Sequence, residues 1–196
     1  MAVVLVDAGG TNIGSVRYAL HRLGVDAALS ADAATIRAAD KVILPGVGAA
    51  GPGMARLRAS GLVEVIRGLR QPVLGVCLGM QLLCAHSEEG DTACLDLIPA
   101  RVRRFADAPG LRVPHMGWNA LEPAREHPLT RGLSTAEQAY FVHSYAVPVG
   151  DWTCATSTHG QTFSAVVARG NFHGMQFHPE RSAALGARLL RNFLEL

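Results

Sequence analysis

The sequence has no apolar stretch long enough to cross a membrane as a helix, which takes about 18 or more consecutive apolar residues. It also lacks a strong charge of either sign, because its 196 residues carry a formal net charge of only +2. A net charge this close to zero gives no support for nucleic-acid binding. The sequence also contains no block of like charges of the kind that would indicate a disordered tail. The N-terminus has no basic segment before Asp7, so it predicts a first strand rather than a signal peptide.

Cysteines are few, and none is spaced as a metal ligand pair: the four are Cys77, Cys84, Cys94 and Cys154. In a chain without an export signal, we expect them to be reduced thiols of a cytoplasmic protein. His173 and His178 are five residues apart around a predicted strand, so together with Cys77 and His143 they give only a weak zinc signal. The sequence therefore predicts no metal and no cofactor.

Hydrophobic residues are plentiful, at 49% of the chain, which suits one full-core domain over residues 1–196. Short apolar runs alternate with helical patterns in the first half, which predicts an α/β fold with a mostly parallel sheet flanked by helices. We expect strands at 3–6, 41–44 (ended by Pro45) and 72–76, and helices at about 12–23, 54–57, 62–69, 78–85 and 182–194. From about 101 to 175, shorter strands predict a mixed or antiparallel extension of this sheet. There, Arg101 to Arg104 alternate with Val102, which indicates a strand with solvated side chains rather than a phosphate-binding patch.

The strongest local signal is Gly75-Val76-Cys77-Leu78-Gly79, where an apolar strand meets a turn and a helix follows at once. This is the arrangement of a nucleophile elbow, with cysteine in place of serine. Flanking glycines leave room for a nucleophile on a sharp turn, and a helix N-terminus under the sulfur favours the thiolate. The alternative is a structural cysteine in a strand-to-helix turn, which the two glycines disfavour.

A cysteine nucleophile also needs a base and a group that orients the base. His178-Pro179-Glu180 supplies both, two residues apart and just after an apolar strand. Strand-like alternation would point His178 and Glu180 the same way. With eight histidines in the chain, a chance surface pair is the alternative, and the elbow argues against it.

A third signal is a glycine-rich turn with Gly46, Gly48 and Gly51 in Gly-x-Gly-x-x-Gly spacing. A dinucleotide site is not expected, because the turn follows Pro45 and an inner strand rather than the first strand of a nucleotide-binding unit. The alternatives are a plain turn or an oxyanion hole. In the latter, the N–H groups of Val47 and Gly48, with that of Leu78, would stabilise the anion formed when Cys77 attacks a carboxamide.

These segments resemble the class I (triad-type) glutamine amidotransferase family over almost the whole chain. The two general signatures are residues 75–81 and Phe177-His178-Pro179-Glu180. Three further segments are similar to the glutaminase subunits of imidazole glycerol phosphate synthase, in histidine biosynthesis: Val113-Pro114-His115-Met116-Gly117-Trp118-Asn119, Tyr140-Phe141-Val142-His143-Ser144-Tyr145 and Asn192-Phe193-Leu194. The resemblance implies a flavodoxin-like fold, with Cys77 as nucleophile, His178 as base and Glu180 as its orienter.

It also implies that Gln81 holds the bound glutamine, helped by the backbone of His143, Ser144 and Tyr145. Members of this group hydrolyse glutamine to glutamate and ammonia and form a heterodimer with a (β/α)8-barrel cyclase. The cyclase uses the ammonia to make imidazole glycerol phosphate and an aminoimidazole carboxamide ribotide. The interface and ammonia exit would include Asn12, Trp118 and Arg181.

The sequence departs from the family pattern in three places. Ala8 and Thr11 stand where a tyrosine and a glycine are usual, His159 replaces the tyrosine of a Tyr-Gly pair, and Arg181 replaces a lysine. None of them touches the triad. The first place (Ala8 and Thr11) and the third (Arg181) lie where members of the family meet their cyclase. These departures therefore bear on how the chain is coupled to its partner.

Three alternatives stand beside this assignment. Residues 7–12 are similar to the phosphate-binding start of actin-like sugar kinases, but 196 residues leave no space for the second domain of a kinase. An amidotransferase of another pathway, such as pyridoxal phosphate synthesis, is disfavoured by residues 116–119 and 141–145. A catalytically silent binding module is disfavoured by the intact triad.

Overall fold

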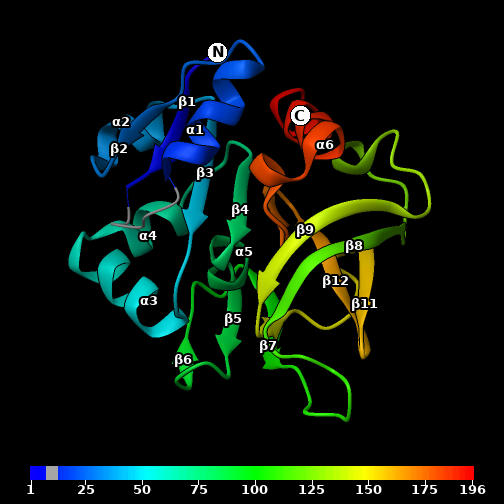
Figure 1. The fold of residues 1–196 in the computed structure, drawn as a ribbon. Coiled ribbons are helices and arrows are strands. Elements are labelled where there is room, and N and C mark those ends of the chain that lie inside the picture. The colour runs from blue at the N-terminus through cyan, green and yellow to red at the C-terminus, as the bar shows by residue number, and fades with distance from the viewer. Residues whose placement is uncertain (8–12) are drawn as a thin grey trace.

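The computed structural model describes residues 1–7 and 13–196, drawn in Figure 1. The first part contains β1 (Val3–Val6), α1 (Ile13–Arg22), β2 (Ala28–Ser30), α2 (Ala33–Ala38), β3 (Lys41–Gly46), α3 (Ala50–Ala59), α4 (Leu62–Arg67), β4 (Val73–Cys77) and α5 (Leu78–Leu82). Then follow β5 (Cys84–Ser87), β6 (Thr92–Ala93), β7 (Ile98–Arg104), β8 (His115–Pro123), the 3₁₀ turn η1 (Pro128–Thr130), β9 (Glu137–His143) and β10 (Tyr145–Ala146). The chain continues with β11 (Thr153–His159), β12 (Gln161–Arg169), β13 (Phe172–Met175), the 3₁₀ turn η2 (Pro179–Arg181) and α6 (Ala183–Leu194).

In the described part of the chain, the main sheet has nine strands in the order β2-β1-β3-β4-β13-β12-β11-β8-β9. Its first five strands are parallel, and β12, β11, β8 and β9 continue it antiparallel. The parallel part has the flavodoxin-like 2-1-3-4-5 order, which confirms the expected fold class. In such sheets, ligands bind beyond the carboxyl ends of the strands, and β3 and β4 end at Gly46 and Cys77.

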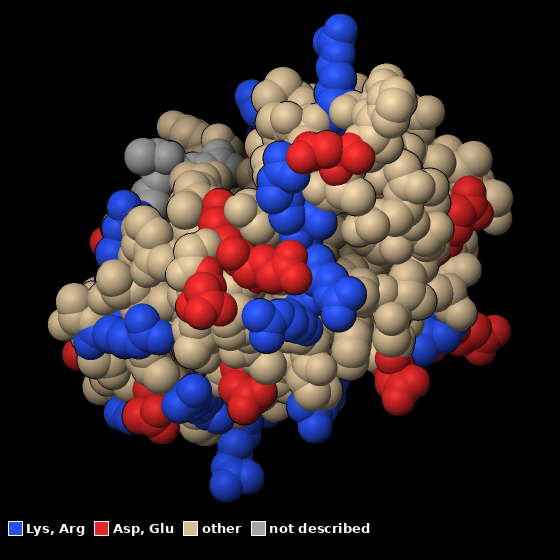
Figure 2. Space-filling model, turned by 90° about the horizontal axis from the view of Figure 1, so that it is seen from below, with Lys and Arg blue, Asp and Glu red and all other residues tan. Residues whose placement is uncertain are grey.

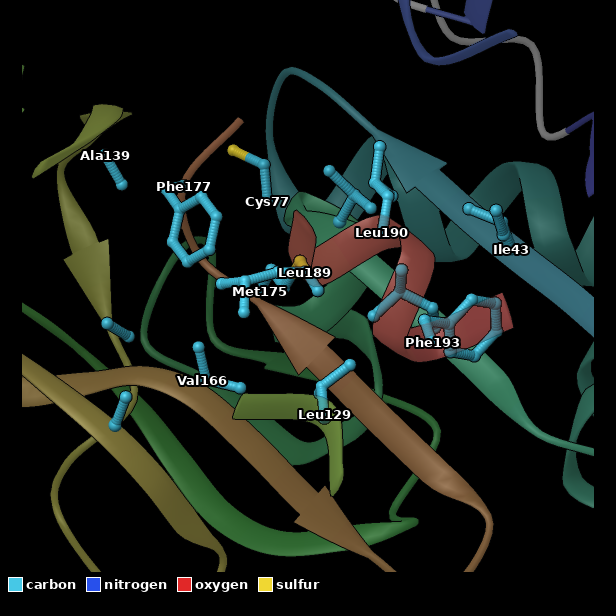
Figure 3. Close-up of a cluster of buried hydrophobic side chains, with 14 of the residues drawn as sticks. Ile43, Cys77, Leu129, Ala139, Val166, Met175, Phe177, Leu189, Leu190 and Phe193 are labelled. Carbon is cyan, nitrogen blue, oxygen red and sulfur yellow. The ribbon is translucent and has the colours of Figure 1, made fainter. Parts of the chain in front are cut away.

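Alternation along the strands fills two cores, one on each face of the sheet. Val3 and Leu5 of β1 pack with α1 and α6, whereas Val4 and Val6 pack with α2, α3 and α4. On the first side, α6 supplies an apolar stripe of Leu185, Leu189, Leu190 and Phe193. Figure 3 shows Leu189, Leu190 and Phe193 near Ile43 and Met175, with Cys77 at the edge of the same cluster.

Three local expectations were wrong. The helix expected at 78–85 ends at Leu82, and Cys84 begins strand β5, because β5 pairs with β6 and β7 in a second, four-stranded sheet. The strand expected to end before Pro45 runs to Gly46. Pro45 is tolerated because β1 pairs with β3 only as far as Ile43, so the missing N–H breaks no bond to β1. Finally, β7 and β10 belong to the second sheet rather than to the extension of the first.

The surface carries both charge signs side by side, as the face in Figure 2 shows. In β7, Val102 is buried while Arg101, Arg103 and Arg104 are exposed, which confirms the expected solvated strand. Arg104 pairs with Asp107 at 3.1 Å. Among the described residues, no helix is long and apolar enough to cross a membrane.

Candidate active site

Cys77 sits on a strained turn between β4 and α5. Its φ of 54° and ψ of −111° lie outside the regions that non-glycine residues ordinarily adopt, as in a nucleophile elbow. Close packing against β3 forces the turn: a Cβ added to Gly79 would lie 1.8 Å from the Leu44 carbonyl oxygen. At Gly75 it would lie 2.6 Å from the Gly79 backbone. The helix has only five residues, so the help it gives a thiolate is confined to the N–H groups of its first turn.

His178 and Glu180 meet beside this turn. His178 Nδ1 and Glu180 Oε1 are 2.8 Å apart, and both side chains are almost fully buried, at 5% and 1% exposure. Strand alternation does not bring His178 and Glu180 together, because β13 ends at Met175 and Pro179–Arg181 is a 3₁₀ turn. The turn is fixed by Ser182 Oγ, which donates to the His178 carbonyl, and by the His178 N–H, which donates to the Tyr140 carbonyl.

The electrostatics favour a protonated His178. Burial alone would lower the pKa of this imidazole, but hydrogen bonds to Cys77 and Glu180, and the charges of both, raise it to about 10. The imidazolium therefore donates to the Cys77 sulfur on one side and to the Glu180 carboxylate on the other. Such a pair holds the nucleophile ready and keeps a proton available for a leaving group.

We expect the His178 ring to titrate near pH 10 rather than near its ordinary value of 6.5. Since the pKa is higher in the folded state, its contribution to stability is complete below pH 6.5 and is lost as the pH rises towards 10. Each pH unit in that window removes up to about 1.4 kcal/mol. NMR titration of the ring and urea unfolding at a series of pH values measure the two effects.

Glu180→Gln is the matched variant, since it removes one cause of the raised pKa and keeps the shape. The ring should then titrate at lower pH, so the alkaline loss of stability, which still begins near pH 6.5, should be smaller and should end at a lower pH. An unchanged midpoint in Glu180→Gln would show that Glu180 does not set the charge of His178.

A cavity of about 280 Å³ opens over Cys77, near the lower end of the range for small-molecule sites. Val47, Gly48 and Leu78 line it together with Cys77 and His178, so the residues expected to donate to an oxyanion lie in the same cavity as Cys77. Gly48 has a φ of +94°, a conformation that favours glycine and lets the Val47–Gly48 backbone turn towards the cavity. A larger hollow at residues 123–133 contains none of these groups.

Gln81 is also in the cavity wall, and its side chain is held firmly. Its Nε2 donates to the Tyr145 carbonyl and to Gln176 Oε1, both at 2.9 Å. With both amide hydrogens used, Oε1 is the atom of Gln81 left to accept from a ligand.

Two residues of this region were missed from sequence. Gln176 is fully buried, and its Nε2 lies 3.9 Å from the Cys77 sulfur. Glu89 lines the cavity and accepts from the Ala50 N–H at 2.7 Å. Gln176 stands two residues before His178, which is a usable signal, whereas nothing near Glu89 in sequence marks it.

Ser144 and Tyr145 line the cavity as expected, but the side chain of His143 has a different setting. It is buried against Phe105, Phe141 and Phe163 and hydrogen-bonded to His115 and the Tyr145 carbonyl. Among the described residues, no group of three or more His, Cys, Asp or Glu side chains could hold a metal ion.

Trp118 and Arg181, two of the three residues expected at a partner face, both lie against Tyr140. Trp118 is 52% exposed and packs edge-on against Tyr140, with ring centroids 6.0 Å apart. The Arg181 guanidinium also lies over Tyr140, 5.3 Å from the ring centroid. Met116, two residues before Trp118 on β8, is exposed as well. Asn12, Ala8 and Thr11 lie outside the described residues.

The chain is similar to known proteins over almost its full length. A family model described as "Glutamine amidotransferase class-I" matches residues 4–196. The chain is 60% identical to the imidazole glycerol phosphate synthase subunit HisH of Xanthomonas axonopodis pv. citri, over 99% of this chain and 97% of that one. It is 57% identical to the HisH subunit of Xylella fastidiosa with the same coverage.

The solved structure of a glutamine amidotransferase aligns with a TM-score of 0.76 at 24% identity. That alignment covers 99% of this chain and 98% of the other. At this identity the likeness concerns the fold.

Proposed function

Because the chain belongs to the class I glutamine amidotransferase family, we propose that it is the glutaminase subunit of an imidazole glycerol phosphate synthase. It hydrolyses glutamine to glutamate and ammonia. The observation that carries the chemistry is the strained Cys77 beside a buried, hydrogen-bonded His178–Glu180 pair at the mouth of one small cavity. We place the reaction in the cytoplasm, where thiols stay reduced, since all four cysteines are free and buried.

Glutamine enters with its carboxamide towards Cys77 and its amino-acid end towards the far wall of the cavity. The Glu89 carboxylate and Gln81 Oε1 are acceptors suited to the α-ammonium group. Backbone N–H groups of the 143–145 segment suit the α-carboxylate. A cavity of about 280 Å³ fits one amino acid of this size.

The Cys77 sulfur attacks the carboxamide carbon, and the carbonyl oxygen becomes an anion held by the N–H groups of Gly48 and Leu78. His178 gives its proton to the nitrogen, the C–N bond breaks, and ammonia leaves a thioester on Cys77. A water molecule then adds to the thioester while His178 takes its proton. The C–S bond breaks, releasing glutamate and restoring the pair.

We further propose that the surface cluster of exposed Met116, Trp118 and Arg181 around half-buried Tyr140 docks the (β/α)8-barrel cyclase that consumes the ammonia. Aromatic residues and arginine are the side chains enriched at the centres of protein interfaces. The cluster is also tied to the triad, because the Tyr140 carbonyl accepts from the His178 N–H at 2.9 Å. Docking on this face would cover the triad side of the molecule and shorten the path of ammonia.

The direct test measures glutamate release from glutamine with and without the cyclase and its nucleotide substrate. We expect hydrolysis in the complex at one glutamate for each imidazole product. If purified complex with both substrates releases no glutamate, the proposed function is wrong. Release of glutamate without any imidazole product would assign the chain to a different synthase.

Arg181→Ala should leave the triad intact but uncouple hydrolysis from synthesis. The arginine packs on Tyr140 at the proposed interface and directly follows Glu180, so its loss opens the junction through which ammonia passes. At the interface Arg181 would pair with an acidic side chain of the cyclase, and such a charge pair at an interface rim is worth about 1 kcal/mol, or more where it is desolvated. The measurement is the ratio of glutamate to imidazole product, which should rise above one.

Arg70→Ala is the matched control, because Arg70 is also an exposed arginine but lies at the other end of β4 from Cys77. It precedes the first residue of that strand, and Cys77 is the last. Its ratio should stay at one. If Arg181→Ala also keeps a ratio of one and binds the cyclase with unchanged affinity, Arg181 is not at the interface.

A further inference from the structure

His115 has no role in the mechanism above, yet its ring is hydrogen-bonded to that of His143, and His143 lines the glutamine cavity. We propose that His115 is a positioning residue for glutamine binding, acting through His143 on the Tyr145 carbonyl that holds Gln81. The inference rests on the proposed function, because it concerns how that same cavity recognises glutamine.

The surroundings of His115 are apolar and aromatic. Its ring stacks on Phe141 on β9 at 5.0 Å and on His159 at 4.2 Å. Phe105 and Phe163 meet it edge-on, at 6.2 and 5.9 Å. In such a setting an unpaired ring nitrogen is costly, so each nitrogen has to find a partner inside the cluster.

Those partners fix the position of every proton. His143 Nδ1 lies 2.7 Å from the Tyr145 carbonyl oxygen, which can only accept, so Nδ1 of His143 carries the hydrogen. Nε2 of a neutral His143 must then accept, and its partner at 3.0 Å is His115 Nδ1, which must donate. His115 Nε2 is left as an acceptor, and the Asn119 amide lies 3.2 Å from it.

Both rings are kept neutral, as this order requires. Burial lowers the pKa of His143 to about 3 and that of His115 to about 4, and the neighbouring His159 adds to both effects. A second proton on His143 would place two donors face to face at 3.0 Å, and a second proton on His115 would face the Asn119 amide donor at 3.2 Å. The hydrogen bonds that link Asn119, His115, His143 and the Tyr145 carbonyl therefore have one stable donor-to-acceptor direction at neutral pH.

This direction matters for glutamine because the Tyr145 carbonyl is shared. It accepts from His143 Nδ1 and from Gln81 Nε2, so the His143 bond helps to hold the carbonyl where Gln81 needs it. Gln81 Nε2 also donates to Gln176, whose own amide reaches the Cys77 sulfur. Turning the His115–His143 pair would free the carbonyl and let Gln81 present its amide instead of its oxygen to the ligand.

Two variants of His115 separate positioning from packing. His115→Phe keeps an aromatic ring in the stack but removes both nitrogens, so His143 loses its donor. His115→Asn loses the ring but keeps an amide N–H close to the place of Nδ1. The loss of a buried hydrogen bond corresponds to about a tenfold weaker interaction. We therefore expect His115→Phe to raise the KM for glutamine about tenfold with kcat changed less than about twofold.

His115→Asn should stay within about threefold of the unmodified KM, even though it is the less stable of the two. The complex with the cyclase is assayed for both variants. A KM in His115→Phe equal to that of the unmodified protein would overturn the inference. So would a KM in His115→Asn as high as that in His115→Phe, because the ring would then be what matters.

A second measurement needs no turnover. In ¹⁵N NMR of the unmodified protein, the rings of His115 and His143 should both be neutral and protonated at Nδ1 at neutral pH. Protonation at Nε2 in either ring would overturn the inference, and this result decides the matter if a variant fails to fold. Absence of both hydrolysis and glutamine binding in the unmodified complex would instead refute the proposed function.

Discussion

Cys77→Ala is expected to abolish glutamine hydrolysis while leaving the fold and the binding of the cyclase unchanged. The rate should fall by about 10⁴-fold or more, as when the nucleophile of a catalytic triad is removed. The loss of the sulfur should disturb the packing little, because Cys77 lies at the edge of the core cluster (Figure 3). Glutamate release by the purified complex is the measurement.

Two controls make the result specific to the elbow. Supplying ammonium salt in place of glutamine should restore imidazole product in the Cys77→Ala complex, because the later chemistry belongs to the cyclase. Replacing Cys84, Cys94 or Cys154 with alanine should lower stability and spare turnover, since all three are buried thiols. Burial raises the thiol pKa of Cys84 far above its ordinary value and that of Cys94 to about 11, so neither supplies a thiolate at neutral pH. Hydrolysis that survives in Cys77→Ala would remove Cys77 from the mechanism.

The sequence was most informative where chemistry is local in the chain. Gly75, Cys77 and Gly79 are neighbours in sequence and in space, and the steric demand that makes the glycines necessary is visible in their spacing. His178 and Glu180 were likewise close enough to be paired from sequence. The reason given for their pairing, strand alternation, was nevertheless wrong, because a 3₁₀ turn brings them together.

The contacts between segments that are far apart in the chain could not be predicted from the sequence. Glu89 reaches the cavity from the turn between β5 and β6 of the second sheet, and neither of these two strands was predicted from the sequence. Gln176 meets Gln81 across 95 positions. The helix after Cys77 was predicted too long for the same reason. Residues 84–87 have no strong strand pattern of their own, and their pairing with β6 and β7 overrides the helical periodicity.

Gly79→Ala is expected to have the second large effect, on stability and activity together. The added Cβ would lie 1.8 Å from the Leu44 carbonyl oxygen, and this atom belongs to the backbone of a central strand and cannot swing aside. Relief requires α5 to move away from β3, which costs about 3 kcal/mol or more. The same movement shifts Cys77 and the Leu78 N–H, and a displacement of about 1 Å costs about 10²-fold in rate.

Gly14→Ala is the matched control for this argument. Gly14 is an exposed residue of α1 with no atom within 4 Å of an added Cβ, so the same substitution should raise the free energy of unfolding by about 0.5–1 kcal/mol. Urea unfolding of both variants and glutamate release by their complexes provide the comparison. If Gly79→Ala were as stable and active as Gly14→Ala, the close contact between α5 and β3 could not be what shapes the elbow. A Gly79→Ala protein that loses activity but keeps full stability would instead show that the strain at Cys77 is set by the turn itself.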